Sequence, residues 1–270
     1  MEGFTKKLSD LKRCYIQLLS AVLYNAHFAG FLTGNIYKGR TKALCAPGLN
    51  CYSCPGAILS CPLGSLQGAF SRHVLSVPMY VLGTLCLFGV LLGRVICGFL
   101  CPFGFFQELL YLIPFIKVKK SRVTRILSFL KYGILILFVV LLPIITLYPS
   151  FCKYICPAGT LEAGIPLVLS DEDLMSSVGW LFSWKVIVLI LCVILCLAFF
   201  RGFCRFLCPL GALYSLFNPV AFFGVKVNKA KCTGCGACVH ACKMDVKAVG
   251  DRECIHCGEC KAACPEGAID

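Results

Sequence analysis

Long runs of apolar residues alternate along this chain with short polar and cysteine-rich segments. Four runs stand out, at residues 14–34, 75–93, 132–148 and 180–200. Each approaches the roughly 20 residues that an α-helix needs to cross a bilayer. The pattern therefore predicts four transmembrane helices.

A second pattern, Cys-Pro-x-Gly followed by a shorter apolar run, comes after each of these segments. The four copies begin at Cys61, Cys101, Cys156 and Cys208. Proline suits the first turn of a helix, because the N–H that it lacks would have no partner there. The copies therefore predict helices near residues 63–70, 103–115, 159–169 and 210–223. Since these helices are too short to span a bilayer, we expect re-entrant or interfacial placement.

A third pattern fills the C-terminal segment, residues 226–270, where Cys-x2-Cys-x2-Cys-x3-Cys occurs twice. This spacing matches bacterial ferredoxins with two [4Fe–4S] clusters, in which each fourth cysteine ligates the other cluster. We expect one cluster on Cys232, Cys235, Cys238 and Cys264, and the other on Cys254, Cys257, Cys260 and Cys242. A structural zinc module is the alternative, but its paired cysteines would be separated by longer gaps.

These patterns predict two parts with different folds. Residues 1–225 are expected to form an all-α membrane bundle of four transmembrane helices and short re-entrant helices, and residues 226–270 a small α+β ferredoxin domain. The chain is 59% hydrophobic and 14% charged, with a mean hydropathy of +0.83. A soluble domain could not cover that much apolar surface, so we expect the lipid bilayer to surround the first part.

The distribution of charge predicts an orientation in the membrane. The formal net charge of +13 could suit nucleic acid. However, the basic residues flank the apolar runs, as Lys12 and Arg13 do before the first run and Lys119 and Lys120 do after the second. By the positive-inside rule, the N-terminus, the second connection and the C-terminal segment lie in the cytoplasm. We therefore expect a multi-pass protein with a cytoplasmic ferredoxin domain and no nucleic-acid partner.

Cysteines of the membrane part are expected to gather at two sites. Alternating helix directions place the second and fourth Cys-Pro copies on the inner face and the first and third on the outer face. The inner face collects Cys97, Cys101, Cys204 and Cys208, which match one four-thiolate cluster site. Three basic residues adjacent in sequence would offset the charge of such a cluster: Arg94, Arg201 and Arg205.

The outer face collects more cysteines than one cluster needs, namely Cys45, Cys51, Cys54, Cys61, Cys152 and Cys156. We expect Cys51, Cys54 or Cys61 to act with Cys152 and Cys156 in a further cluster. A redox-active disulfide and a metal-ion site are alternatives for this face. For Cys86, Cys192 and Cys196 we favour simple packing over a third site in the middle of the membrane.

The residues quoted above resemble a family of membrane-bound polyferredoxins, 4Fe–4S binding proteins associated with nitrate reductase and with nitrous-oxide reductase. The resemblance is carried by the two C-x3-C-P elements that start at Cys97 and Cys204, and by the eight C-terminal cysteines. It implies an electron carrier of the prokaryotic inner membrane. The implied electron donor is a cytoplasmic protein such as a ferredoxin or a flavoprotein, or the quinone pool. The extra outer cysteines depart from the two C-x3-C-P elements usual in the family.

Three functional hypotheses follow, and the third is a scaffold for cluster assembly or sensing, whose clusters would be lost or transferred rather than cycled. The first is a relay that passes electrons from the ferredoxin clusters through the inner site to the outer site, with two C-terminal clusters and one or two further clusters in the membrane part. The second is an enzyme, a copper or quinone reductase that uses the C-x3-C-P thiols. The sequence contains no dinucleotide fingerprint, phosphate loop or hydrolase nucleophile in a recognisable context, which favours the carrier.

Overall fold

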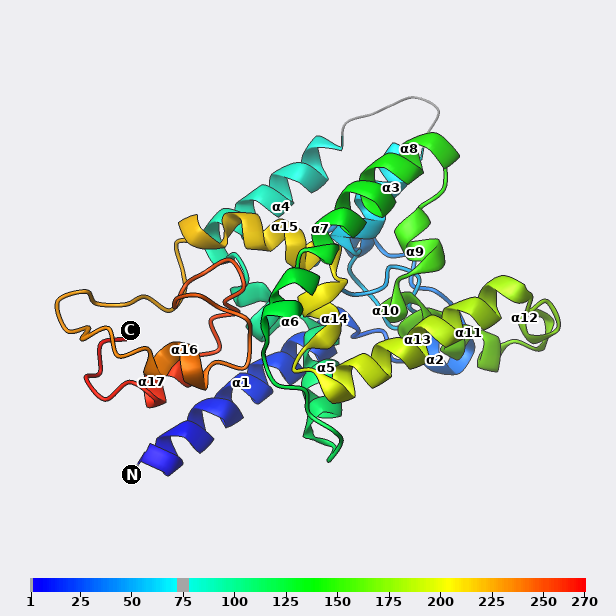
Figure 1. Cartoon of the computed structure of the whole chain (residues 1–270). Coiled ribbons are helices and arrows are strands. Elements are labelled where there is room, and N and C mark those ends of the chain that lie inside the picture. Colours follow the sequence, from blue (N-terminus) through cyan, green and yellow to red (C-terminus); the bar gives the residue numbers. More distant parts are fainter. Residues whose placement is uncertain (1, 72–77) are drawn as a thin grey trace.

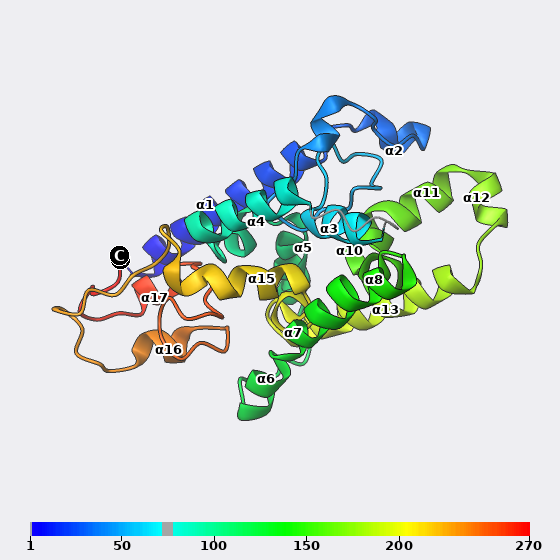
Figure 2. The ribbon, with the colours of Figure 1, turned by 90° about the horizontal axis from the view of Figure 1, so that it is seen from above.

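The computed structural model describes the backbone of residues 2–71 and 78–270, and the side chains from residue 11 onward within these ranges. The described residues form helices and loops, with no β-strand among them. In both views the short helices α16 (Ala237–Ala241) and α17 (Glu259–Ala262) of the C-terminal segment lie at one end of the molecule, and α12 (Glu172–Ser176) lies at the other (Figures 1 and 2). The cysteine-rich helices of the predicted membrane part lie between these ends.

Two helices of the described residues are long and apolar enough to cross a membrane. One runs over Arg122–Thr146 and comprises α6 (Arg122–Leu127), α7 (Leu130–Ile134), the π-helical η3 (Leu135–Leu141) and α8 (Leu142–Thr146). The other is α13 (Trp180–Ala198). Their most apolar windows are only 28% and 17% buried, so both helices present apolar surface outward, unlike the core helices of soluble proteins. They correspond to the third and fourth predicted segments.

The prediction of four transmembrane helices is wrong for the first segment. Helix α1 (Glu2–Tyr24) ends within it, and only the five-residue α2 (Ala29–Thr33) follows. The side chain of Asn25 explains the break, because its Nδ2 donates to the Ala21 carbonyl at 3.0 Å and to Asn50 Oδ1 at 3.0 Å. Asparagine side chains that bond to nearby backbone groups in this way compete with helix continuation.

The second predicted segment is also too short. Helix α4 (Met79–Leu92) has 14 residues, and residues 75–77 of the segment lie outside the described part of the chain. Pro78 precedes the helix, and Gly93 ends it with a φ of +50°, in the region that favours glycine. A helix of this length cannot cross a bilayer of ordinary thickness.

The predicted helix starts at the four Cys-Pro pairs are confirmed. The helices are α3 (Pro62–Phe70), α5 (Pro102–Leu112), α10 (Pro157–Gly159) and α15 (Pro209–Phe217). In each, proline occupies the first turn and the cysteine is the extended residue that caps it. After α10 the chain continues through the π-helical η4 (Thr160–Gly164) into α11 (Ile165–Ser170).

Short helices also carry the cysteines that precede three of these pairs. They are the π-helical η2 (Ile96–Leu100) with Cys97, α9 (Ser150–Tyr154) with Cys152, and α14 (Gly202–Phe206) with Cys204. Two short 3-10 helices, η1 (Arg40–Ala43) and η5 (Asn218–Val220), lie in the connections. Helix α1 packs against η2, since Gln17 Nε2 donates to the carbonyl of Gly98 in η2 at 2.8 Å.

The prediction of an α+β ferredoxin domain is wrong, because the C-terminal segment contains no sheet in the described chain. A single isolated antiparallel bridge joins Val227 and Ile269, flanked by mutual hydrogen bonds of Lys226 and Asp270 at 3.0 Å. The pairing stops there because the chain turns into loops that hold cysteines, with positive φ at Gly234 and Gly236.

Candidate metal centres

The four cysteines of the predicted inner site are all buried, with exposed fractions of 5% or less. They are Cys97 on η2, Cys101 at the start of α5, Cys204 on α14 and Cys208 at the start of α15. The four thiols lie close enough together to influence one another electrostatically. The structure therefore brings together the two C-x3-C-P elements, which are more than 100 positions apart in the sequence.

Two fully buried arginines cross between these elements. Arg94 precedes Cys97 by three positions and donates from Nη2 to the carbonyl of Cys204 at 3.3 Å. Arg201 precedes Cys204 by three positions and donates from Nη1 to the carbonyl of Cys97. The arginine before each C-x3-C-P element thus donates to the first cysteine of the other element, and the two guanidinium groups lie beside the four thiols.

The glycines of the two inner Cys-Pro-x-Gly copies lie beside these guanidiniums. A Cβ on Gly104 would lie 3.1 Å from Arg201 Nη1, and a Cβ on Gly211 would lie 3.7 Å from Arg94 Nη2. A side chain at Gly104 would therefore push the arginine away from the cysteines.

The electrostatic environment of the inner site favours a thiolate at Cys204. Its pKa is lowered to about 6, first because the Cys208 thiol donates a hydrogen bond to it, with further contributions from Arg201, Gln107 and Arg94 that outweigh burial. The pKa of Cys97 is instead raised, because burial outweighs the attraction of Arg94 and Arg201.

The residues of the inner site fit a four-thiolate iron–sulfur cluster. Four buried sulfur donors match the ligand set of a [4Fe–4S] cluster. The Nε of Arg94 is buried without a hydrogen-bond partner, although its guanidinium lies beside the thiols, so a donor is available to an anionic group. Within the described residues, no three His, Cys, Asp or Glu side chains converge on a single point as a mononuclear metal requires. In a four-iron cluster each cysteine binds a different iron atom.

The C-terminal segment packs directly against the inner site. Glu253 pairs with Arg94 at 2.7 Å and with Lys131, and the side chains of both bases are fully buried. On the same face, Asn218 donates to the carbonyl of Cys254 at 2.9 Å. Glu253 immediately precedes Cys254, a predicted cluster ligand, so one carboxylate connects the ferredoxin loop to an inner-site arginine.

A further ion pair, between Arg205 and Asp245, holds α14 against the same segment. Of the three arginines predicted to offset cluster charge, Arg94 and Arg201 therefore contact the inner site, whereas Arg205 serves the contact between the two parts.

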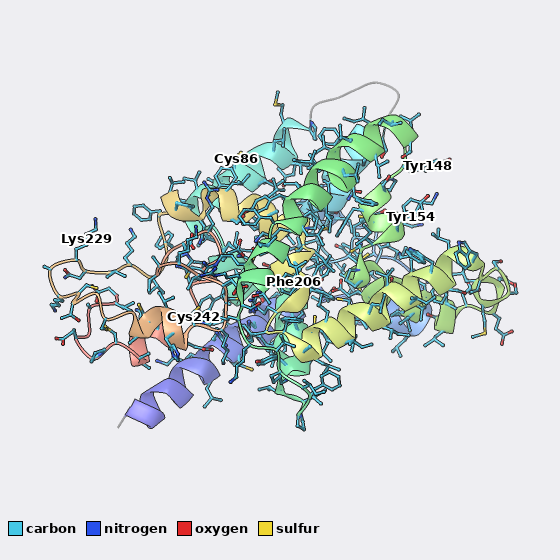
Figure 3. All side chains as sticks on the ribbon, viewed as in Figure 1. Cys86, Tyr148, Tyr154, Phe206, Lys229 and Cys242 are labelled. Carbon is cyan, nitrogen blue, oxygen red and sulfur yellow. The ribbon has the colours of Figure 1, made fainter. Side chains whose placement is uncertain are left out.

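One predicted ligand set of the C-terminal segment is gathered in the structure. Cys242, labelled in Figure 3, follows α16 and lies near Cys254 and Cys257. Burial, together with the nearby thiols of Cys257 and Cys254, raises the pKa of Cys242 to about 12. Cys260 lies near the same two thiols. Of the other set, Cys232 and Cys235 are exposed, and Cys238 and Cys264 are half-buried.

The outer site is a cavity of about 470 Å³ whose wall includes Cys51, Cys61, Cys152 and Cys156. Tyr148, labelled in Figure 3, also lines it. A Cβ on Gly159 would lie 3.8 Å from Cys51 Sγ and 3.9 Å from Cys156 Sγ, so both thiols lie beside this glycine. Four thiols around a hollow of this size fit an iron–sulfur cluster.

The remaining outer cysteines are not part of that wall. The thiol of Cys54 lies 3.6 Å from Asn25 Oδ1, and Cys45 lies near Ser65 and Thr84. Of the predicted alternatives Cys51, Cys54 and Cys61, the cavity wall thus includes Cys51 and Cys61. Cys86 is exposed on α4 (Figure 3), whereas Cys192 and Cys196 are buried on α13.

Three polar residues near the sites were not predicted. Gln67 and Gln107 donate to the sulfurs of Cys152 and Cys204, and Glu162 accepts from the backbone N–H of Cys51 at 2.7 Å. Burial raises the pKa of Glu162 to about 7. All three occupy the seventh position of a Cys-Pro-x-Gly copy, and this recurrence is the signal by which the sequence could have revealed them.

Comparison with known proteins places both parts of the chain among iron–sulfur proteins. One profile of a 4Fe-4S binding domain matches residues 74–122, 131–165 and 180–229, and a second 4Fe-4S binding domain profile matches residues 225–247 and 250–270. An uncharacterized protein of Methanocaldococcus jannaschii is 34% identical over 76% of this chain and 80% of its own length. No solved structure matches.

Two further relatives carry descriptive names. The ferredoxin-type protein NapH of Haemophilus influenzae is 27% identical over 97% of this chain and 86% of its own length. The methylamine utilization ferredoxin-type protein MauN of Methylobacillus flagellatus is 28% identical over 68% of this chain and 61% of its own length. The chain belongs to the polyferredoxin family of ferredoxin-type 4Fe-4S binding proteins.

Proposed function

We propose that this 4Fe–4S electron-transfer protein relays single electrons between its C-terminal clusters, the inner site and the outer site. One observation carries the proposal: Glu253, next to the predicted ligand Cys254, pairs with Arg94, which lies beside the inner thiols Cys97 and Cys204. The ferredoxin loop and the inner site are therefore in direct contact. A [4Fe–4S] cluster bound at each site supplies a one-electron redox centre.

The protein groups around the inner site hold charge and exclude water. Arg94 and Arg201 are fully buried, so their positive charges act on the thiolates through a medium of low dielectric. Each arginine forms an ion pair with its own carboxylate. Arg94 pairs with Glu253 and Arg201 pairs with Glu108, both at 2.7 Å. These pairs compensate the buried charges while leaving the guanidiniums beside the sulfurs.

The relay would run between a cytoplasmic face and the outer site. The two long apolar helices support placement in a membrane, and the basic flanks support a cytoplasmic C-terminal segment in a multi-pass topology of the prokaryotic inner membrane. A cytoplasmic ferredoxin or flavoprotein, or the quinone pool, would then exchange electrons with the C-terminal clusters. The cavity at the outer site would meet the redox partner on the other side.

Replacing Cys97 and Cys204 together by serine in the full chain is expected to abolish transfer through the inner site. Proteoliposomes with dithionite at the C-terminal side and a membrane-impermeant dye inside measure that transfer. The C-terminal clusters should keep their EPR signals, because their ligands are untouched. Cys86→Ser, an exposed cysteine outside the sites, is the matched control. Unchanged dye reduction in the double variant would show that electrons bypass the inner site.

A second candidate function is a reductase for copper ions or quinone at the outer thiols. The cavity of about 470 Å³ favours it, because a substrate could reach Cys51 and Cys152, which are half-buried rather than enclosed. If this function is correct, adding Cu²⁺ or a quinone to the reduced protein should reoxidise it, and Cys152→Ser should prevent this. A carrier without its own substrate should not be reoxidised by either compound.

A further inference from the structure

Two buried glutamines reach across between Cys-Pro-x-Gly copies in the same way at both sites. Gln107, on α5, donates from Nε2 to the sulfur of Cys204 at 3.0 Å, and Gln67, on α3, donates from Nε2 to the sulfur of Cys152 at 3.3 Å. Both glutamines are 0% exposed. At each site, a glutamine of one Cys-Pro-x-Gly copy therefore donates to the first cysteine of the C-x3-C-P element that supplies the site's other two thiols.

The orientation of each amide is fixed by a backbone N–H that can only donate. The N–H of Cys204 donates to Gln107 Oε1 at 3.2 Å, and the N–H of Phe151 donates to Gln67 Oε1 at 2.9 Å. The thiol of Cys196 on α13 lies 3.5 Å from the same Gln107 oxygen. Because the oxygen must face these donors, the NH2 group of each amide must face the sulfur.

The same position in the other two copies does not donate to sulfur. Glu162 accepts from the N–H of Cys51, and the hydroxyl of Tyr214 donates to the carbonyl of Pro47 at 2.8 Å. Each four-thiolate site thus receives one side-chain amide donor, from the second copy at the inner site and from the first copy at the outer site.

We propose that Gln107 and Gln67 set the reduction potentials of the inner and outer sites by donating an N–H to one ligand sulfur in each. The proposal rests on the proposed function, in which these cysteines hold clusters. Reduction adds one electron, supplied by the C-terminal clusters or by a chemical reductant, and forms or breaks no covalent bond. The added negative charge is partly borne by the sulfurs, so an N–H donor stabilises the reduced state more than the oxidised state. Burial strengthens this effect, because the surrounding dielectric is low.

Gln107→Met in the full chain tests the inner site, because methionine has a similar length but no N–H to donate. The EPR signal of the inner site is the one that is absent from the Cys97→Ser, Cys204→Ser double variant. In an EPR-monitored redox titration of Gln107→Met, the midpoint potential of this signal should be lower than in the unmodified protein. We expect about a tenfold smaller equilibrium constant for reduction, which corresponds to about 59 mV for a one-electron couple. The C-terminal signals should keep their potentials.

Tyr214→Phe is the matched control, since it removes a hydrogen bond at the equivalent position that does not involve sulfur. The inner potential should not move in this variant. An unchanged potential in Gln107→Met with full iron content would overturn the proposal while leaving the proposed function intact. Absence of any inner-site signal from the unmodified protein would instead refute the proposed function.

Gln67→Met provides an independent second variant at the outer site. It should lower the potential of the outer signal and leave the inner signal in place. If both methionine variants lose iron from their sites, the glutamines hold the sites together rather than set their potentials, and the proposal is wrong.

Discussion

Replacing Cys61 and Cys156 together by serine is expected to remove about four iron atoms and about four sulfides per chain, the content of one [4Fe–4S] cluster. Both cysteines line the outer cavity, together with Cys51 and Cys152. Loss of two of four ligands leaves too few thiolates to hold a cubane. Anaerobic iron and sulfide quantitation of the purified full-length protein, with EPR of the remaining clusters, measures the loss.

Cys54→Ser is the matched control for the outer site. Cys54 belongs to the same cysteine-rich loop, but its thiol lies near Asn25 rather than on the cavity wall, so iron content should not change. The assignment would be reversed if Cys54→Ser lost iron while Cys61→Ser retained it. Equal iron in the unmodified protein and the double variant would mean that the outer thiols hold no cluster.

Glu253→Gln is expected to destabilise the contact between the C-terminal segment and the inner site by about 3–5 kcal/mol, the usual cost of removing one partner from a buried ion pair. Glu253 is the carboxylate shared by Arg94 and Lys131, whose side chains are both fully buried. Without it, two positive charges remain buried without compensation. Denaturant titration in detergent, followed by the loss of iron–sulfur absorbance, gives the change in the free energy of unfolding.

Two further variants check that the cause is uncompensated charge. Glu266→Gln removes an exposed carboxylate of the same segment and should change the free energy of unfolding little. Adding Lys131→Met to Glu253→Gln should recover part of the loss, because one buried charge is removed. If the double variant is no more stable than Glu253→Gln, the ion pairs do not explain the effect.

Features that depend on neighbouring residues in the chain could be predicted from the sequence. The helix starts at Pro62, Pro102, Pro157 and Pro209 follow from the backbone chemistry of proline. The iron–sulfur family follows from the cysteine spacing, which the two 4Fe-4S profiles match. The third and fourth apolar segments were recognisable as potential membrane helices because they are long apolar runs in which Lys185 is the only charged residue.

Features that depend on contacts between distant segments were decided by the tertiary structure. The helix of the first apolar segment ends early because the Asn25 side chain is hydrogen bonded to Asn50, 25 positions later. Hydropathy alone carries no information about such a partner. The isolated bridge of Val227 with Ile269 replaces the predicted sheet because the intervening chain is occupied by cysteine loops.

Local spacing along the chain is enough to identify a 4Fe–4S binding protein and to place the starts of its Cys-Pro helices. The packing of distant helices, in contrast, brings Cys61 rather than Cys54 to the cavity wall with Cys152 and Cys156. It also places Gln67 and Gln107 where they donate to sulfur. Those contacts join residues more than 80 positions apart. Their formation depends on how the helices pack, which local patterns do not specify.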